Sequence, residues 1–534
     1  MPLSRQMRLL SCLAGLALAC GMSACWIIAW RLAFGPHGSF FTFGFVGDEY
    51  LYAQRVQALL PGATATNPIN GVCDPAIVSE YYLEDGCRCI VSATGLNAIT
   101  FVWVWRIAFP LLLAATLVWL ARECLQRRRM WGAPLRWAAA AAAFSFLYCG
   151  YDLVTRYPPL QGWLHRFPTN IEYPLSVLTA LLYIRFLNLP SAGRGAALAL
   201  AGAAVIYLRP YLAIPWGLAL GSGLAWLSIR RALPLRVTLA IVATLLAALA
   251  PWLAVRQWNA GNEVHRQMLQ RYFLSTPYQV HPYWPLYLGA ALVLALSAPA
   301  VERRFRPFVL SGAFALLLLP FLCGAFSFGR ELVEYERCGA FYFVALFAAG
   351  MLALRQRTLS WHGRSGLAAA QGWAAALASA ALLASGGVAY ANARYDLLAY
   401  PFSQYPSIVA DLPSVPAYDW IREHTPADAL FLVDDGYDWS RNARYNRQNR
   451  PLVRAFAPDG AYLLSREDLF QLVARRRRVY SERLYGTALP NADLEQLAYL
   501  QRGTFGLPVA PDEFHAALKH FRPTHILWRN GRAP

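Results

Sequence analysis

The stretch AALALAGAAVIYLRPYLAIPWGLALGSGLAWLSI, residues 196–229, decides how the rest of this chain is arranged. It consists of two apolar pieces, residues 196–208 and 212–229, joined at Arg209-Pro210. Each piece is short for a membrane span, and proline breaks a helix. We interpret the stretch as a hairpin of two spans with Arg209 near the outer membrane surface. A single broken span is the alternative, and it would move everything that follows to the other side of the membrane.

The composition extends this interpretation to most of the chain. Of 534 residues, 57% are hydrophobic and only 15% are charged. A soluble protein of this length could not hide so much apolar surface behind so few charges. Apolar runs of about 16–26 residues recur over roughly the first 390 positions, which is typical of a helical membrane protein with many spans. The net charge of +18 lies largely in short loops between these runs, so we expect no nucleic-acid partner.

Arginines set the direction of the spans. Clusters of them follow the apolar runs at residues 98–121, 212–229, 284–301 and 338–354, and the positive-inside rule places those loops in the cytoplasm. The sequence therefore predicts about eleven spans, with the N-terminus inside and the C-terminal region outside. The first run, residues 9–34, is too long for a secretory signal, and we expect it to remain as the first span.

Two regions lie outside the predicted spans. The first external loop, residues 35–97, holds the adjacent carboxylates Asp48 and Glu49, followed by an amphipathic stretch suited to the membrane surface. From about residue 393 charges become frequent. The sequence thus predicts a transmembrane domain, residues 1–392, and a soluble C-terminal domain, residues 393–534.

The C-terminal region has the pattern of a small α/β domain. We expect helices at residues 416–425, 466–485 and 511–521, and strands at residues 429–433 and 524–528. The run of arginines at residues 475–478 is interpreted as a solvated helix face, with contact to anionic lipid or glycan as the alternative.

Three cysteines of the first external loop, Cys73, Cys87 and Cys89, have two possible roles. In an oxidising compartment Cys73 could form a disulfide with Cys87 or Cys89. The Cys-x-Cys spacing is also compatible with zinc, although no histidine lies nearby. The sequence leaves both roles open.

Charged residues gather at the outer ends of the predicted spans, where a charge is costly unless something pairs with it. Arginine holds phosphate through paired hydrogen bonds, and a carboxylate takes a proton from an attacking hydroxyl. A lipid-linked phosphosugar needs both groups at this depth, because its tail stays in the bilayer while its sugar projects outward. Helix capping, local ion pairing and interfacial anchoring are the competing structural explanations. Asp48 and Glu49 lie in the first external loop, and Arg209 lies at the turn of the hairpin. Further external loops are predicted at residues 155–173, which include Glu172, at residues 256–283, which begin with Arg256 and include His265, and at residues 329–337, which end with Arg337.

Three short motifs carry a resemblance to a known family. The run Asp48-Glu49-Tyr50-Leu51-Tyr52-Ala53 resembles the Asp-Glu-x-x-Tyr-Ala pattern of GT-C fold glycosyltransferases, such as bacterial aminoarabinose transferases and protein O-mannosyltransferases. Leu208-Arg209-Pro210 is similar to an Arg-Pro found in a mid-chain span of that family. Tyr335-Glu336-Arg337 is similar to the Arg-Tyr that starts a late helix, with Cys338 here in place of the tyrosine.

The resemblance implies a polytopic GT-C-like fold in the cytoplasmic membrane of a bacterium, with the C-terminal domain in the periplasm. It implies inverting transfer of a hexose or pentose from a polyprenyl-phosphate donor to a glycan, lipid or protein acceptor. Asp48 would be the general base and Glu172 a second acid. Glu49 would orient the acceptor or, with Asp48, bind a divalent cation, which some relatives need. The donor phosphate would be held by Arg209, Arg256 and Arg337.

Other classes also fit a membrane chain of this composition. A lipid-linked saccharide transporter or flippase would favour internal repeats and charges buried in mid-span. A glycan polymerase or ligase would be expected to place its key arginines and histidines in a large late loop between spans. This chain instead has its charges at span ends and its larger external segments early and at the C-terminus. A membrane scaffold that binds a partner is a further alternative.

Overall fold

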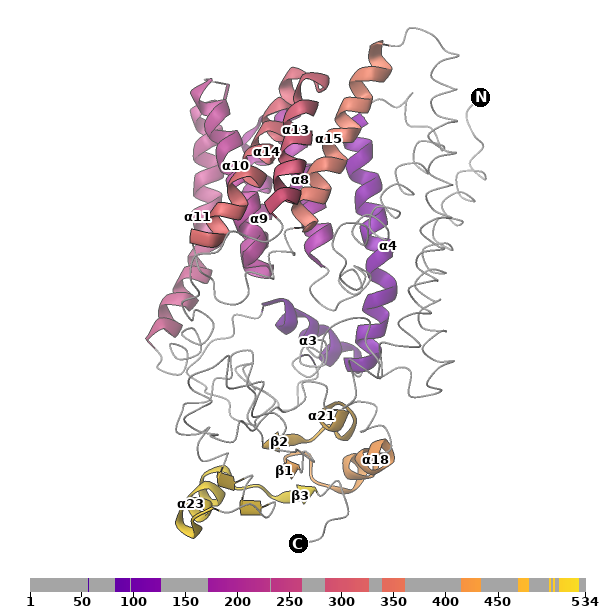
Figure 1. The fold of residues 1–534 in the computed structure, drawn as a ribbon, viewed down its shortest axis with the longest axis vertical. Helices are drawn as coiled ribbons and strands as arrows, with labels where there is room; N and C mark the ends of the chain where they lie inside the picture. The colour runs from indigo at the N-terminus through magenta and orange to yellow at the C-terminus, as the bar shows by residue number, and fades with distance from the viewer. Residues whose placement is uncertain are drawn as a thin grey trace, which may run out of the picture. The chain divides into compact units, whose positions relative to one another are not determined.

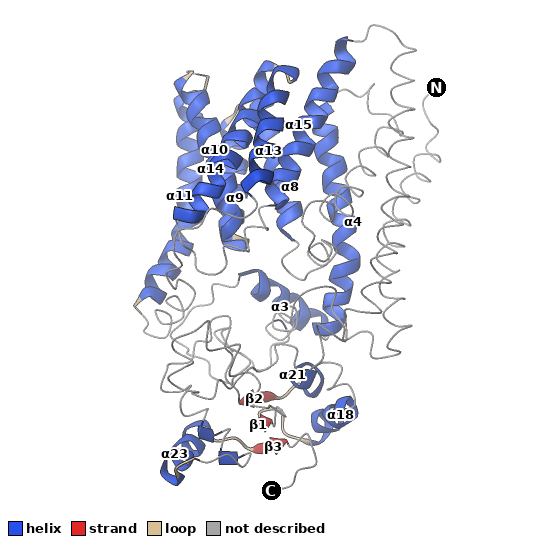
Figure 2. Cartoon of the chain, viewed as in Figure 1, coloured by secondary structure: helices blue, strands red, loops and turns tan. Residues whose placement is uncertain are grey.

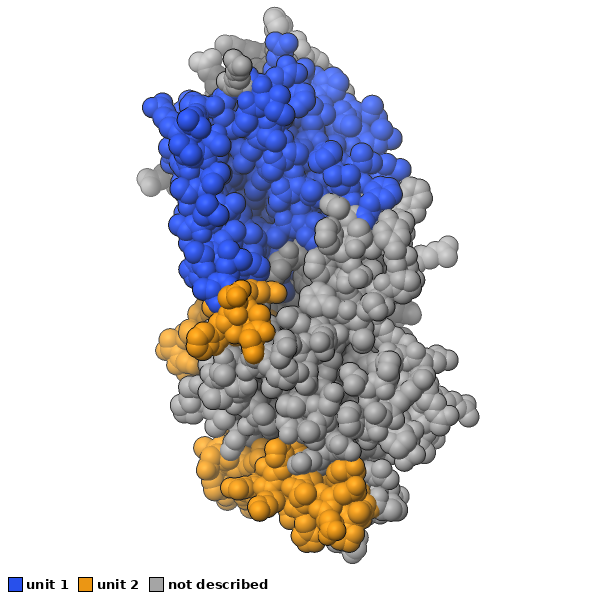
Figure 3. Space-filling model, turned by 90° about the vertical axis from the view of Figure 1, so that its left-hand side faces the viewer, with its two compact units in different colours: residues 1–35, 104–254, 273–397 blue, residues 36–103, 255–272, 398–534 orange. Residues whose placement is uncertain are grey.

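A computed structural model describes residues 56, 82–96, 98–125, 171–230, 232–261, 284–325, 339–360, 414–433, 469–479, 499–500, 503–504 and 509–527. This part of the chain is mostly helical (Figures 1 and 2). The chain divides into two compact units, which Figure 3 colours separately. Unit 1 comprises residues 1–35, 104–254 and 273–397, and unit 2 comprises residues 36–103, 255–272 and 398–534.

Unit 1 is a bundle of apolar helices. Its elements are α4 (Ala98–Leu125), α8 (Glu172–Asn188), α9 (Ala192–Leu208), α10 (Pro210–Ile229), α11 (Leu235–Ala260), α13 (Trp284–Ser297), η3 (Ala298–Ala300), η4 (Arg303–Phe305), α14 (Arg306–Ala325) and α15 (Gly339–Ser360). The first residues of α4 and the last residues of α11 belong to unit 2. Within the described ranges, two helical segments are long and apolar enough to cross a membrane, Leu212–Ile229 and Leu235–Ala260.

The predicted break at Arg209-Pro210 is confirmed. Helix α9 ends at Leu208 and α10 begins at Pro210, whose missing N–H is harmless at the first position of a helix. A Cβ added to Gly202 of α9 would lie 3.9 Å from the Leu220 side chain of α10. One straight helix would hold these two positions about 27 Å apart, so the two helices fold back on each other as a hairpin.

One end of the bundle is rich in arginine. Glu123, near the C-terminus of α4, pairs with Arg185, near the C-terminus of α8, so these helices run parallel. Arg194, in the first turn of α9, donates to the Arg185 carbonyl at 3.0 Å, and Arg304, before α14, donates to the Asn188 side chain. We call this the arginine end. The helix directions agree with those predicted from the arginine clusters.

Helices α9 and α11 also run parallel, as predicted. A Cβ on Gly195, near the start of α9, would lie 2.7 Å from Ile241 Cγ1 of α11, so only glycine allows this approach. Further along, the Tyr207 hydroxyl of α9 reaches the Ala248 carbonyl of α11 at 2.8 Å. The two contacts follow the same order along both helices, which fixes their common direction.

Unit 2 contains a small parallel sheet. Its elements are α3 (Tyr82–Thr94), α18 (Val415–His424), β1 (Leu430–Val433), α21 (Leu469–Ala474), β2 (Arg477–Val479), α23 (Pro511–Phe521) and β3 (His525–Leu527). Strand β1 lies between β2 and β3 and is parallel to both. Leu432 of this central strand is buried with Leu500, Ala517 and Phe521. The predicted α/β pattern is therefore confirmed for the elements α18, β1, α23 and β3.

The helix predicted over residues 466–485 is confirmed for Leu469–Ala474 and wrong for residues 475–479. Helix α21 ends at Ala474, and Arg475 follows with φ 51°, a left-handed conformation that stops a helix. The chain then enters β2 at Arg477. The local sequence favours a helix here. Residues 477–479 form a strand instead, because they pair with the distant strand β1.

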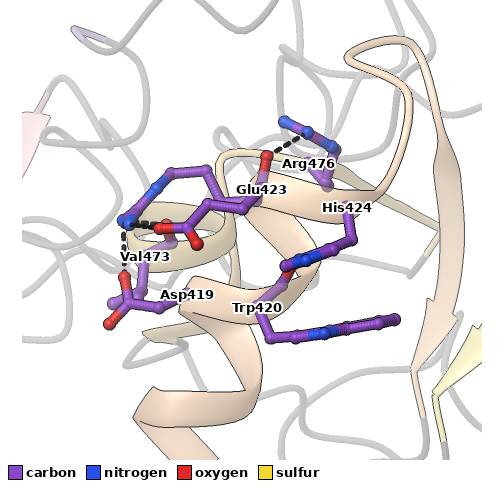
Figure 4. Close-up of polar contacts among 7 residues, drawn as sticks. Asp419, Trp420, Glu423, His424, Val473 and Arg476 are labelled. Carbon is purple, nitrogen blue, oxygen red and sulfur yellow. Dashed lines mark hydrogen bonds and ion pairs between the residues drawn. The ribbon is translucent and has the colours of Figure 1, made fainter.

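The interpretation of residues 475–478 as a solvated helix face is also wrong, because Arg476 is buried. Its guanidinium donates to the Arg422 carbonyl at 2.6 Å (Figure 4). It also donates to the Thr425 carbonyl at 2.6 Å, and so caps the end of α18. A further bond reaches the Thr425 hydroxyl at 2.9 Å. Burial lowers the pKa of the Arg476 guanidinium, and the neighbouring charge of Arg422 lowers it further.

Three other expectations change. Glu172 and Arg256 were expected in external loops, but Glu172 lies in the first turn of α8 and Arg256 lies within α11. The first external loop, to which no helix was assigned after the amphipathic stretch, contains α3.

Along α3 Cys87 is buried and Cys89 is exposed, so a single metal ion cannot take both thiolates from this helix. Cys73 lies outside the described residues, as do the apolar runs at residues 9–34 and 367–392.

Candidate functional site

Glu172 and Arg209 meet at the end of unit 1 opposite the arginine end. Glu172 lies in the first turn of α8, and Arg209 is the residue that joins α9 to α10. Arg209 Nε and Glu172 Oε1 are 3.5 Å apart, and the two side chains are only 9% and 5% exposed. The structure thus brings together two of the residues predicted to act at the outer membrane face.

The local backbone explains why Arg209 projects between helices. Its N–H donates to the Val205 carbonyl at 2.8 Å and closes α9, while its own carbonyl accepts from the Leu212 N–H at 3.0 Å and opens α10. With φ −152° and ψ 80° it belongs to neither helix. Pro210 enforces this break, because proline disfavours a helical conformation in the residue before it. The side chain is therefore held at a fixed junction.

The guanidinium of Arg209 has an unsatisfied edge. Nε and Nη2, which form one side of the planar fork, are buried, and neither meets a hydrogen-bond acceptor among the described residues. Glu172 balances the charge, but at 3.5 Å it does not complete a hydrogen bond to Nε. Buried charged donors are normally satisfied, because an unmet one costs about 1–3 kcal/mol or more. An oxyanion with two adjacent oxygens, such as a phosphate, matches this edge.

The position of this edge also favours an anion. Arg209 is the N-cap residue of α10, a helix of 20 residues, and its side chain makes no capping bond. The N-terminus of a helix carries partial positive charge and attracts phosphate. The guanidinium edge and the N-terminus of α10 thus both attract negative charge to the same place.

A packed layer lies on the inner side of the pair. Trp216, two turns after Arg209, donates from Nε1 to Ser176 Oγ at 3.2 Å, and Ser176 lies one turn after Glu172. The Trp216 ring meets Phe341 of α15 edge-on, with centroids 4.9 Å apart. Trp216 and Ser176 are buried. This layer fixes the spacing of α8 and α10 below the ion pair and keeps water out.

Sequence analysis did not select Ser176, Trp216 or Tyr207. The signal that could have found Ser176 and Trp216 is their spacing, since residues four and seven positions after Glu172 and Arg209 lie on the same helix faces. The pairing itself could be recognised only once the hairpin and α8 were packed together.

The remaining predicted site residues are not all placed. Arg256 is half-buried in α11, in the part that belongs to unit 2. Asp48, Glu49, His265 and Arg337 lie outside the described residues, so their roles stay predictions. The described ranges contain no group of three or more His, Cys, Asp or Glu side chains able to hold a metal ion.

No protein-family model matches the chain, and neither does any curated protein. The described geometry is a buried guanidinium edge, whose shape matches an oxyanion, at one end of an apolar helix bundle.

Proposed function

We propose that the protein is an inverting glycosyltransferase of GT-C type. It moves a sugar from a polyprenyl-phosphate-linked donor to an acceptor hydroxyl at the outer face of the bacterial cytoplasmic membrane. The observation that carries the proposal is the buried Nε–Nη2 edge of Arg209, charge-balanced by Glu172 at the helix ends. The donor phosphate supplies the two oxygens that this edge lacks.

The membrane setting is supported by the apolar surface of α11. Its exposed residues include Leu239, Leu246, Leu253 and Trp258. A continuous apolar surface of this kind is a liability in water and is required against lipid. We propose about eleven spans, with the arginine end in the cytoplasm and the Glu172–Arg209 end outside. The C-terminal α/β region, residues 393–534, then lies in the periplasm.

The chemistry assigns a task to each residue. Asp48 takes the proton of the acceptor hydroxyl as that oxygen attacks the anomeric carbon from the face opposite the phosphate. The bond between the anomeric carbon and the phosphate oxygen breaks, its electron pair stays on the phosphate, and polyprenyl phosphate leaves. Arg209 stabilises the charge that develops on this leaving group. Glu172 holds the guanidinium in place before the donor arrives.

Other site residues complete the proposal. Arg256 and Arg337 add positive charge for the donor phosphate, and Glu49 orients the acceptor. If a divalent cation takes part, Asp48 and Glu49 would bind it, and chelation in the assay below tests that requirement.

The place of the ion pair favours an enzyme over a transporter. Transporter substrate sites lie near the bilayer midplane, typically in interrupted helices. Glu172 and Arg209 instead lie in the first turn of α8 and at the junction of α9 and α10, which are helix ends. A phosphate at that depth sits at the membrane surface, where a polyprenyl tail remains in the bilayer.

The proposal is tested with the full chain in lipid nanodiscs. Undecaprenyl-phosphate-linked hexoses and pentoses serve as donors, and release of undecaprenyl phosphate in the presence of membrane-extract acceptors is measured. Asp48→Asn is expected to lower the rate by roughly 10²–10⁴-fold, the loss typical of a missing general base. Glu123→Gln, at the arginine end, is the matched control and should retain the rate. Near-normal turnover in Asp48→Asn contradicts the assignment.

The membrane topology has a separate test. A reporter that is active only in the periplasm is fused after Arg532. Activity of the fusion supports the proposed orientation. Activity of a cytoplasmic reporter at the same position contradicts both the span number and the external site.

A further inference from the structure

Tyr207 makes an uncommon contact with the backbone of α11. Its hydroxyl donates to the Ala248 carbonyl at 2.8 Å and accepts from the Trp252 N–H at 3.1 Å. These two groups are four residues apart, so in a regular helix they bond to each other. The hydroxyl of α9 therefore serves both partners of a single turn of α11.

The contact is made beside a proline of α11. Pro251 lies inside the helix and has no N–H to donate to the Ala247 carbonyl, so the helix lacks one backbone hydrogen bond there. Helices bend at such positions, and a polar side chain that enters the hydrogen-bond ladder stabilises the bend. The boundary between the two compact units falls at residues 254 and 255, immediately after Pro251. The Tyr207 contact therefore falls on the turn of α11 that contains Pro251.

Tyr207 also lies beside the proposed phosphate site. It is in the last turn of α9, two residues before Arg209, whose N–H closes that turn. Helix α9 also approaches α11 closely at Gly195, but that contact is near the start of α9, far from Arg209. The hydroxyl is therefore a polar contact that holds the Arg209 end of α9 against α11.

We propose that Tyr207 is a positioning residue: its hydroxyl pins the end of α9 to the turn of α11 that contains Pro251, and thereby holds the guanidinium edge of Arg209 where the donor phosphate binds. The inference rests on the proposed function. Tyr207 does not touch the substrate, and it acts only through the place of Arg209. A loose end of α9 would let the guanidinium turn toward Glu172 and lose the edge that faces the ligand.

The test replaces Tyr207 by Phe, which removes only the hydroxyl. Undecaprenyl phosphate, the leaving group, is the probe, and its affinity for the full chain in nanodiscs is measured by native mass spectrometry. We expect Tyr207→Phe to weaken binding about tenfold, which corresponds to about one net hydrogen bond. Tyr183→Phe, which alters another buried tyrosine of the bundle, is the matched control and should bind normally.

Hydrogen exchange supplies a readout that does not depend on the ligand. In Tyr207→Phe the amide of Trp252 loses the hydrogen bond to the Tyr207 hydroxyl, so exchange in the segment around Pro251 should become faster, while Tyr183→Phe leaves it unchanged. Unchanged exchange in Tyr207→Phe overturns the inference, and so does faster exchange with normal probe binding. If the wild-type protein does not bind the probe, the proposed function fails, and the positioning role fails with it. The exchange measurement still shows in that case whether the Tyr207 hydroxyl holds α9 to α11.

A second variant guards against simple misfolding of Tyr207→Phe. Pro251→Ala restores an N–H for the Ala247 carbonyl and reduces the need for the hydroxyl. The further loss of probe affinity caused by Tyr207→Phe should therefore be smaller in the Pro251→Ala background. An equal loss in both backgrounds contradicts the inference.

Discussion

The two ends of the bundle in unit 1 each carry an acid–arginine pair, and the two pairs are built differently. At the arginine end Arg185 bonds Glu123 at 3.0 Å, with side chains 35% and 20% exposed. Arg185 also stacks over the Trp119 ring at 5.0 Å. At the other end Arg209 and Glu172 are 9% and 5% exposed, are 3.5 Å apart, and leave two guanidinium nitrogens without an acceptor among the described residues.

The difference separates an ion pair that forms a direct hydrogen bond from a buried pair that leaves charged donors unsatisfied. A partly exposed pair with a good hydrogen bond closes a helix end and contributes little energy. A buried pair with poor geometry costs more than it returns, unless a third group completes its hydrogen bonds. Under the proposed function that third group is the donor phosphate.

The largest expected difference between the ends is in activity. Arg209→Lys keeps the charge but removes the two-nitrogen edge, and we expect transfer to fall by about 10²–10³-fold, as for the loss of a group that stabilises developing negative charge. Arg185→Lys should change the rate by no more than about fivefold, because a partly exposed pair is worth about 0.2–1 kcal/mol. Initial rates of undecaprenyl phosphate release measure both. Equal losses would remove the distinction between the ends.

The next difference is in stability. Glu172→Gln leaves the Arg209 charge buried without a counterion, which should lower the free energy of unfolding by about 3–5 kcal/mol. Glu123→Gln should lower it by at most about 1 kcal/mol, and this smaller effect should fade in 1 M salt, because partly exposed charges are screened. Unfolding in mixed micelles, at low and high salt, measures both variants. A Glu172→Gln protein as stable as wild type would show that the pair is not buried as described.

The smallest effect is expected between the ends, where α8 and α10 must keep their spacing. A Cβ on Gly223 of α10 would overlap the Tyr183 hydroxyl of α8. Gly223→Ala should therefore cost about 1–3 kcal/mol in overpacking. Gly217→Ala is the control on the same helix, where an added Cβ meets nothing within 4 Å and should stabilise by about 0.5–1 kcal/mol. A harmless Gly223→Ala would indicate that the spacing can relax, and that the ends are not rigidly linked.

The helices of unit 1 were predictable because long apolar runs and prolines act locally. Residues 196–208 and 212–229 correspond to α9 and α10, and Pro210 marks the break between them. The same logic misplaced Glu172 and Arg256, because a charged residue can continue a helix beyond its apolar run. The sequence shows where an apolar run ends. The helix itself can continue beyond that point, as far as the last residue whose backbone hydrogen bonds are kept.

Pairings between distant residues were not predictable in the same way. Sequence analysis selected Glu172 and Arg209 one by one, but their contact depends on how α8 packs against the hairpin. In unit 2, Arg477 and Arg478 have no strand pattern of their own and become strand only by pairing with Leu430 and Phe431. The buried cap made by Arg476 also needs α18, more than 50 positions earlier. Such features arise from tertiary contacts that override local propensity.

The order of strands in unit 2 has a consequence for the synthesis of the chain. The central strand β1 is made first of the three, and its Leu430 is bonded in both directions to Thr524, which is 94 positions later. At about 5–20 residues per second, the ribosome delivers Thr524 about 5–20 s after Leu430. During that interval one edge of β1 has no β3 to pair with. The domain can close only when the late strand emerges, so its folding is timed by translation.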